Sequence, residues 1–196
     1  MSRPRRSEPT RQRLLEAGAA MLLEQGYHGT GIQPVLDEVG VPKGSFYNYF
    51  ESKEHFAAEI IRHMAARVCT SLEGLTRESK KDALGALRRD LKRRIAGFEG
   101  HFSGGCLFGN LGAEVEDSEA CRAALAEAFR AMSACYAAVL AAGQEQGTIR
   151  SDVKAGELAD HLIDAWEGAL LRMKVERSTR PLKQVVRRLL ESDFLA

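Results

Sequence analysis

The sequence has few cysteines and no long hydrophobic run, and each shortage excludes a class of protein. Its four cysteines lack close pairing, which argues against a disulfide-stapled domain, and no Cys/His cluster has the spacing of a zinc site. The longest stretch without a charged residue, 131–144, is shorter than the roughly 20 apolar residues that span a bilayer. No signal peptide is visible near the start of the sequence. We therefore expect free thiols, no metal, no membrane partner and a cytoplasmic location.

A strong excess of one charge is also missing. The formal net charge is +1, which argues against a protein that binds DNA through charge alone. The balance is nevertheless uneven, because arginines at positions 3, 5, 6, 11 and 13 face a single acid, Glu8. A basic N-terminal segment of this kind can contact DNA phosphates or the minor groove, and Arg5 and Arg6 are the candidate residues. The alternative is that the segment is a solvated terminus without a function in binding.

No segment sustains the period-two alternation of a strand, whereas apolar residues recur at intervals of three and four. The sequence therefore predicts an all-α fold. Gly26 is expected to end the first helix, and Ser52 and Ser118 are expected to cap two later ones. Outside the segment 30–53, the expected helices cover 9–25, 53–75, 82–97, 106–115 and 119–146, followed by two that include 158–173 and 182–194.

Residues 30–53 have the pattern of a helix-turn-helix, with two short helices separated by a glycine turn and followed by a third. Gly40 stands at the turn, where a residue without Cβ adopts the left-handed conformation at little cost. Pro42 is expected at the first position of the second helix. Val35 and Phe46 belong to an apolar seam that joins the two helices.

The second short helix carries cationic and hydrogen-bonding groups away from this seam, the chemistry that reads a major groove. Predicted DNA-binding residues of this helix are Lys43, Gly44, Ser45, Tyr47 and Asn48, with Thr30, Tyr49 and Lys53 expected to contact phosphates.

The segments 42–54, 11–18 and 26–30 resemble the signature of TetR-type transcriptional regulators over about the first 65 residues. The first reads Pro-Lys-Gly-Ser-Phe-Tyr-Asn-Tyr-Phe-Glu-Ser-Lys-Glu. The resemblance implies a three-helix DNA-binding domain over 1–53 and a helical ligand-binding and dimerisation domain over 54–196. It also implies a homodimer that represses from palindromic double-stranded DNA until a small molecule is sensed, without a cofactor and without catalytic residues.

The last two helices each carry an apolar stripe, and two such helices per chain form a four-helix bundle with a second copy. The alternative is that both stripes are used inside one subunit. Predicted dimerisation residues are Leu162, Trp166, Leu170, Val186, Leu189 and Leu190.

Two segments of the domain expected over 54–196, called the body below, resemble the TetR-type branch that contains the NemR and AcuR repressors. These segments are 104–112 and 166–174. That resemblance implies an effector among reactive or unsaturated small molecules, including electrophiles. Predicted sensor residues are Cys106, Phe108, Asn110, Trp166 and Lys174.

Cys106 is the expected reactive thiol, because it opens a predicted helix whose dipole favours the thiolate, with Lys174 or His101 as a cationic neighbour. Cys121 and Cys135 lie on an apolar stripe and are expected in the core. Three alternatives stay open: a structural Cys106 with a non-covalent inducer, a regulator that binds DNA constitutively, and a helical thiol enzyme.

Overall fold

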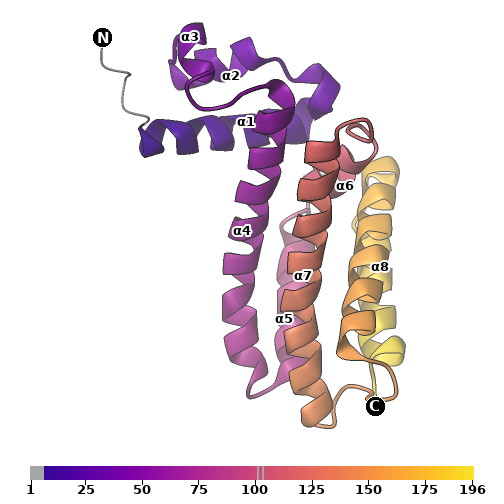
Figure 1. The fold of residues 1–196 in the computed structure, drawn as a ribbon. Coiled ribbons are helices and arrows are strands. Elements are labelled where there is room, and N and C mark those ends of the chain that lie inside the picture. Colours follow the sequence, from indigo (N-terminus) through magenta and orange to yellow (C-terminus); the bar gives the residue numbers. More distant parts are fainter. Residues whose placement is uncertain (1–6, 101, 103) are drawn as a thin grey trace. The chain divides into compact units, whose positions relative to one another are not determined.

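The computed structural model describes residues 7–100, 102 and 104–196, so the predictions for Arg5, Arg6 and His101 lie outside the described residues. Helices account for most of this part of the chain (Figure 1). Its β-structure is an isolated bridge between Ile149 and Leu195. The all-α prediction is confirmed.

The chain divides into two compact units. The first comprises 1–66 and 106–128, and the second comprises 67–105 and 129–196. Two long helices, α4 (Lys53–Ser79) and α7 (Glu119–Glu145), contribute to both units. The predicted division at 53/54 stays a prediction about function, but the packing places the segment 106–128 with the N-terminal helices. This grouping determines which parts of the molecule can influence the DNA-binding helices directly.

The first unit is built from α1 (Glu8–Gly29), α2 (Ile32–Val39), α3 (Lys43–Phe46), α6 (Leu107–Gly112) and the first parts of α4 and α7. Gly40 ends α2 with φ 71°, and its N–H donates to the Asp37 carbonyl at 3.2 Å, as the turn prediction requires. The core of this unit includes Leu14, Leu15, Leu36, Phe46, Phe50 and Ile60.

Several predicted boundaries are wrong by a few residues. The helix expected over 182–194, for example, ends at Arg188 and continues as a π-helical turn. Pro42 is the residue before α3 rather than its first residue. The helix that begins at Lys53 continues to Ser79, four residues beyond its predicted end. The short helix predicted over 106–115 is only the six residues of α6, because it stops at Gly112.

The second unit contains α5 (Ala83–Ala96), α8 (Ala155–Glu176), α9 (Arg180–Arg188) and a π-helical turn (Leu189–Asp193). The basic face of α5 is partly neutralised by a buried acid, Asp90, which is 3% exposed. Asp90 pairs with Arg93 and accepts from Nε of Arg94 at 2.6 Å. These pairs favour a solvated structural face over a second DNA contact.

Helix α7 is long and apolar enough, by length and composition, to pass as a membrane span. The core helix of a soluble protein passes the same test. In this chain α7 supplies Cys121, Ala124, Val139 and Leu140 to the protein core, all of them fully buried. The helix is therefore a packing element.

Candidate functional site

Helix α3 presents polar groups outward while one aromatic side chain anchors it. Phe46 is fully buried, and its ring centroid lies 5.4 Å from those of both Phe50 and Phe56. Lys43 and Gly44 are exposed, and Ser45 and Asn48 are half-buried. Tyr47 is 61% exposed, an unusual degree for an aromatic residue in a folded protein. The arrangement gives a short rigid element with hydrogen-bonding groups on its open side.

The three residues predicted to contact phosphates differ in their exposure to solvent. Tyr49 and Lys53 are half-buried, and the Lys53 ammonium lies 4.4 Å from the ring centroid of Tyr27. Thr30 is only 4% exposed, and its hydroxyl donates to the Gly26 carbonyl at 2.7 Å. We therefore correct the prediction for the Thr30 side chain, which closes the end of α1 instead of facing solvent.

A carboxylate from the segment after α6 holds the break in α1. Glu114 Oε2 accepts from the backbone N–H of Tyr27 at 2.8 Å and from that of His28 at 3.3 Å. Gly26, just before them, has φ 72° and ψ 179°, and a Cβ there would lie 2.5 Å from a Glu114 oxygen. The position thus requires glycine both for its backbone angle and for the approach of the carboxylate.

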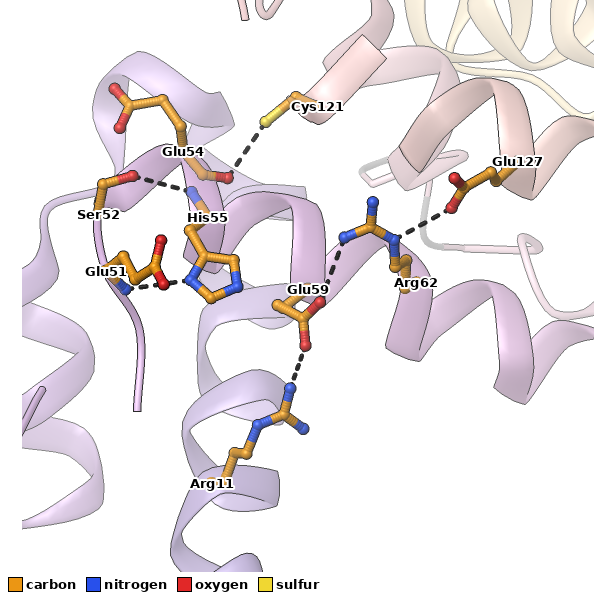
Figure 2. Close-up of polar contacts among 9 residues, drawn as sticks. All are labelled: Arg11, Glu51, Ser52, Glu54, His55, Glu59, Arg62, Cys121 and Glu127. Atoms are coloured by element: carbon orange, nitrogen blue, oxygen red, sulfur yellow. Dashed lines mark hydrogen bonds and ion pairs between the residues drawn. The ribbon is translucent and has the colours of Figure 1, made fainter. Parts of the chain in front are cut away.

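Tyr27 connects this break to the start of α4. Its hydroxyl donates to Glu54 Oε1 at 3.3 Å. Burial, followed by the charges of Glu54 and Cys121, raises the pKa of Tyr27 to about 12, so the hydroxyl stays a neutral donor at physiological pH. The predicted cap of α4 is confirmed, because Ser52 Oγ accepts from the His55 N–H at 3.1 Å (Figure 2).

A chain of ion pairs crosses the same unit from α1 to α7 (Figure 2). Arg11 of α1 pairs with Glu59 of α4, and Glu59 also pairs with Arg62 at 3.2 Å. Arg62 then donates to Glu127 of α7 at 3.1 Å, and this hydrogen bond raises the Arg62 pKa. The Arg62–Glu127 pair is exposed enough to add little stability, at most about 1 kcal/mol, so its contribution is mainly to orientation.

The predicted sensor residues fall on two segments. Cys106 is half-buried and immediately precedes α6, where its carbonyl accepts from the Asn110 N–H at 3.0 Å. Phe108 is 3% exposed, so it is a core residue of the first unit. Trp166 and Lys174 are half-buried on α8 in the second unit. Because α6 has only six residues, the helix-dipole argument for Cys106 is weaker than predicted.

His63 of α4 is a residue that the sequence reasoning missed. Within the described part of the chain, its Nε2 is a buried side-chain atom without a hydrogen-bond partner. Leaving such an atom unpaired is unfavourable by about 1–3 kcal/mol. His63, Asp90 and Glu114 share one property: no local pattern marks them, since a lone polar residue on a helix or turn is normally solvated.

The predicted dimerisation residues are buried within the single chain. Leu162, Leu170, Val186, Leu189 and Leu190 are between 2% and 5% exposed. They pack against their own subunit, so the prediction that they form the interface is wrong and the intrasubunit alternative holds for them. Only Trp166 of that set is half-buried.

Other apolar groups of α8 are open to solvent. Leu171 is 64% exposed and Val175 is 78% exposed, and they lie one turn apart on one face of the helix. A groove of about 710 Å³ also lies on α8 and α9, lined by residues that include His161, Ala165 and Val185.

Comparison with known proteins agrees with this architecture. The family model described as "Bacterial regulatory proteins, tetR family" matches residues 14–60, and "Tetracyclin repressor-like, C-terminal domain" matches 81–189. The chain is 36% identical over 177 residues to the HTH-type transcriptional repressor DhaR of Mycobacterium sp. strain GP1, covering 90% of this chain and 88% of DhaR.

It is also 32% identical over 195 residues to the transcriptional regulator AcuR of Cereibacter sphaeroides, covering 94% of this chain and 89% of AcuR. The crystal structure of Escherichia coli NemR in its reduced form superimposes with a TM-score of 0.87 at 30% identity, covering 96% of this chain and 98% of NemR. Family models and relatives together span both units. The chain belongs to the TetR family of bacterial transcription regulators.

Proposed function

We propose that the protein is a homodimeric repressor that binds a palindromic operator in the bacterial cytoplasm and releases it when a small molecule acts on the body. The observation that carries the proposal is the Glu114 carboxylate. It joins the segment after α6 to the backbone of the DNA-binding helices α1, α2 and α3, called the head below, within one compact unit. A change in α6 therefore has a short physical route to the head.

In the proposed complex α3 enters the major groove. Lys43, Gly44, Ser45, Tyr47 and Asn48 supply its contacts, and Tyr49 and Lys53 stand beside the phosphates. One short helix reads only a few base pairs, so two heads on a two-fold symmetric site are needed for useful specificity. Homodimers and ligand response are typical of this family, which supports the same arrangement.

We expect Lys53→Ala and Asn48→Ala to weaken operator binding in different ways. Loss of a phosphate contact by Lys53→Ala should lower affinity across all sequences and reduce the salt slope by about one ion. Loss of a base contact by Asn48→Ala should relax the sequence preference. If the amide binds one base in a bidentate manner, the discrimination against the wrong base at that position should fall by about 1–3 kcal/mol. Fluorescence anisotropy at several salt concentrations, on a site selected from random DNA, measures both.

Lys80→Ala is the matched control, because Lys80 is an exposed lysine of the second unit, outside the proposed interface. Unchanged affinity, salt slope and site preference in both the Lys53 and the Asn48 variant would contradict the proposed DNA interface.

The proposed dimer interface is the open face of α8 and α9 rather than their buried stripes. Leu171 and Val175 are the exposed large apolar groups of α8. The groove lined by His161, Ala165 and Val185 offers a second place on α8 and α9 for side chains of another copy. An exposed apolar patch on a soluble protein usually marks an interaction site. Trp166, half-buried on the same helix, contributes at the edge of this face.

The effector is proposed to act on Cys106 and the α6 segment. A half-buried thiol that directly follows two glycines is reachable by a small electrophile, and addition to its sulfur would add bulk at the start of α6, the helix that carries Phe108 and Asn110. Lys174 and Trp166 belong to the second unit, so their predicted part in the sensor stays a prediction. A non-covalent effector is the second candidate, favoured by the unpaired buried Nε2 of His63, which a polar ligand atom would satisfy.

A further inference from the structure

Two cysteines that the proposed function does not use lie close together in the second unit. Cys69 lies on α4 and Cys135 on α7, and the Cys69 thiol is near enough to raise the pKa of Cys135. Both side chains are half-buried, so a small oxidant can reach them, and neither is in a disulfide. The expectation that Cys135 is a buried core residue is therefore wrong.

The register of the two helices independently places these residues at one level. Gln146, just beyond α7, donates from Nε2 to the carbonyl of Ser79, the last residue of α4, at 2.7 Å. Cys69 stands ten residues before Ser79, and Cys135 stands eleven before Gln146. At about 1.5 Å per residue these positions are about 15 and 16 Å back along two helices that run in the same direction.

The surroundings of Cys135 suggest a different role for each thiol. Burial, together with the hydrogen bond to Cys69 and the nearby Glu73, raises the pKa of Cys135 to about 11. Cys135 therefore stays protonated at physiological pH. We accordingly assign the first attack on an oxidant to the Cys69 sulfur and the resolving step to Cys135.

We propose that Cys69 and Cys135 form an oxidisable dithiol, which a hydroperoxide closes to a disulfide that joins α4 to α7. The Cys69 sulfur attacks one peroxide oxygen, the O–O bond breaks, and the other oxygen leaves as water or an alcohol, leaving a sulfenic acid. The Cys135 sulfur then attacks the Cys69 sulfur, the S–O bond breaks, and water leaves with the Cys135 proton. The two thiols together give two electrons to the peroxide.

Such a bond would be reversible in a reducing compartment, which suits regulation rather than permanent stabilisation. Its position differs from that of the proposed effector site, because Cys106 belongs to the first unit and the dithiol to the second. The inference consequently stands or falls independently of the proposed function.

The test uses the full-length wild-type protein treated with equimolar hydrogen peroxide and digested with trypsin without reductant. We expect the peptides 68–77 and 131–150 to be recovered as one crosslinked species that is two hydrogens lighter than its parts. Its rate of formation should not depend on protein concentration, as for an intramolecular bond. Recovery of both peptides unlinked, while other thiols have been oxidised, would overturn the proposal.

Variants test the two roles. Cys135→Ser should accumulate a sulfenic acid at Cys69 that dimedone traps, whereas Cys69→Ser should leave Cys135 unlabelled. Cys121→Ser is the control, because Cys121 is fully buried and the crosslink should form without it. A crosslink that instead joins Cys106 to either residue would contradict the pairing.

A second measurement does not depend on oxidation. Phenylarsine oxide bridges two thiols that are close enough to share one arsenic atom, so the wild type should retain one arsenic per chain against excess monothiol. Both serine variants should lose it. Failure of the wild type to retain arsenic would show that the two sulfurs are too far apart for a disulfide, which demands a Cα separation of about 4.4–6.8 Å.

Discussion

Glutamate at both Leu171 and Val175 should give a folded monomer that no longer binds its operator specifically. The two side chains are 64% and 78% exposed, so their replacement changes the stability of the subunit by no more than about 0.5 kcal/mol. In a two-fold symmetric interface, however, the substitutions place four carboxylates in one apolar contact. Operator affinity should then fall by about a thousandfold or more, to the level of non-specific binding.

Light scattering and circular dichroism report the oligomeric state and the fold, and anisotropy reports operator affinity. Ala126→Glu, at an exposed position of α7, adds the same charge away from the proposed interface and should remain dimeric. Leu162→Glu should behave differently, since it buries a charge in the subunit core and should unfold the protein. A double variant that is still dimeric with wild-type affinity would contradict the proposed interface.

Glu114→Ala should weaken operator binding about tenfold and make the remaining binding less responsive to the effector. The substitution leaves the N–H groups of Tyr27 and His28 without their acceptor, which is unfavourable by about 1–3 kcal/mol. Opening of the segment around Gly26 should loosen the attachment of α2 to α1. Hydrogen exchange should accelerate locally at residues 26–31, while the second unit keeps its protection.

Two variants separate this effect from a general change of charge. Glu114→Gln keeps an acceptor oxygen at the same position and should retain most of the affinity. Glu116→Ala removes an exposed acid two residues further on and should have no effect. Wild-type affinity and wild-type effector response in Glu114→Ala would show that the carboxylate does not couple the α6 segment to the head.

The helices and their turns were predictable from the sequence because each follows a local rule. The turn at Gly40 requires a left-handed residue, Ser52 caps the helix that follows it, and apolar residues at intervals of three and four define each buried face. The predicted helix ends differ from the observed ones by a few residues where the sequence has no strong stop signal, as at Ser79.

The predicted dimer interface failed for a physical reason. An apolar stripe on α8 or α9 indicates that another helix packs against it. The same stripe is expected whether that helix belongs to the same subunit or to a second copy. Leu162 and Leu189 are covered within the subunit, and the exposed Leu171 and Val175 lie outside the periodic stripe. Only the three-dimensional packing distinguishes the two cases.

The link between the head and the body was not predictable in this way. Glu114 is separated from Tyr27 by 87 residues, and a glutamate in a short turn is normally solvated. The Cys69–Cys135 pair required the register of α4 against α7, which no local pattern contains. Contacts of this kind depend on tertiary packing, and they are the contacts on which the proposed regulation rests.

The central claim is that modification of the α6 segment releases the DNA-binding head. Its most direct test is the release of operator DNA by a limiting quinone, followed by anisotropy on wild-type protein and Cys106→Ser, with mass spectrometry to locate the adduct. We predict that wild-type release rises in proportion to the adduct on Cys106, and that Cys106→Ser binds the operator but stays bound after treatment. Equal release from both proteins, or an adduct that forms first at another cysteine, would contradict the claim.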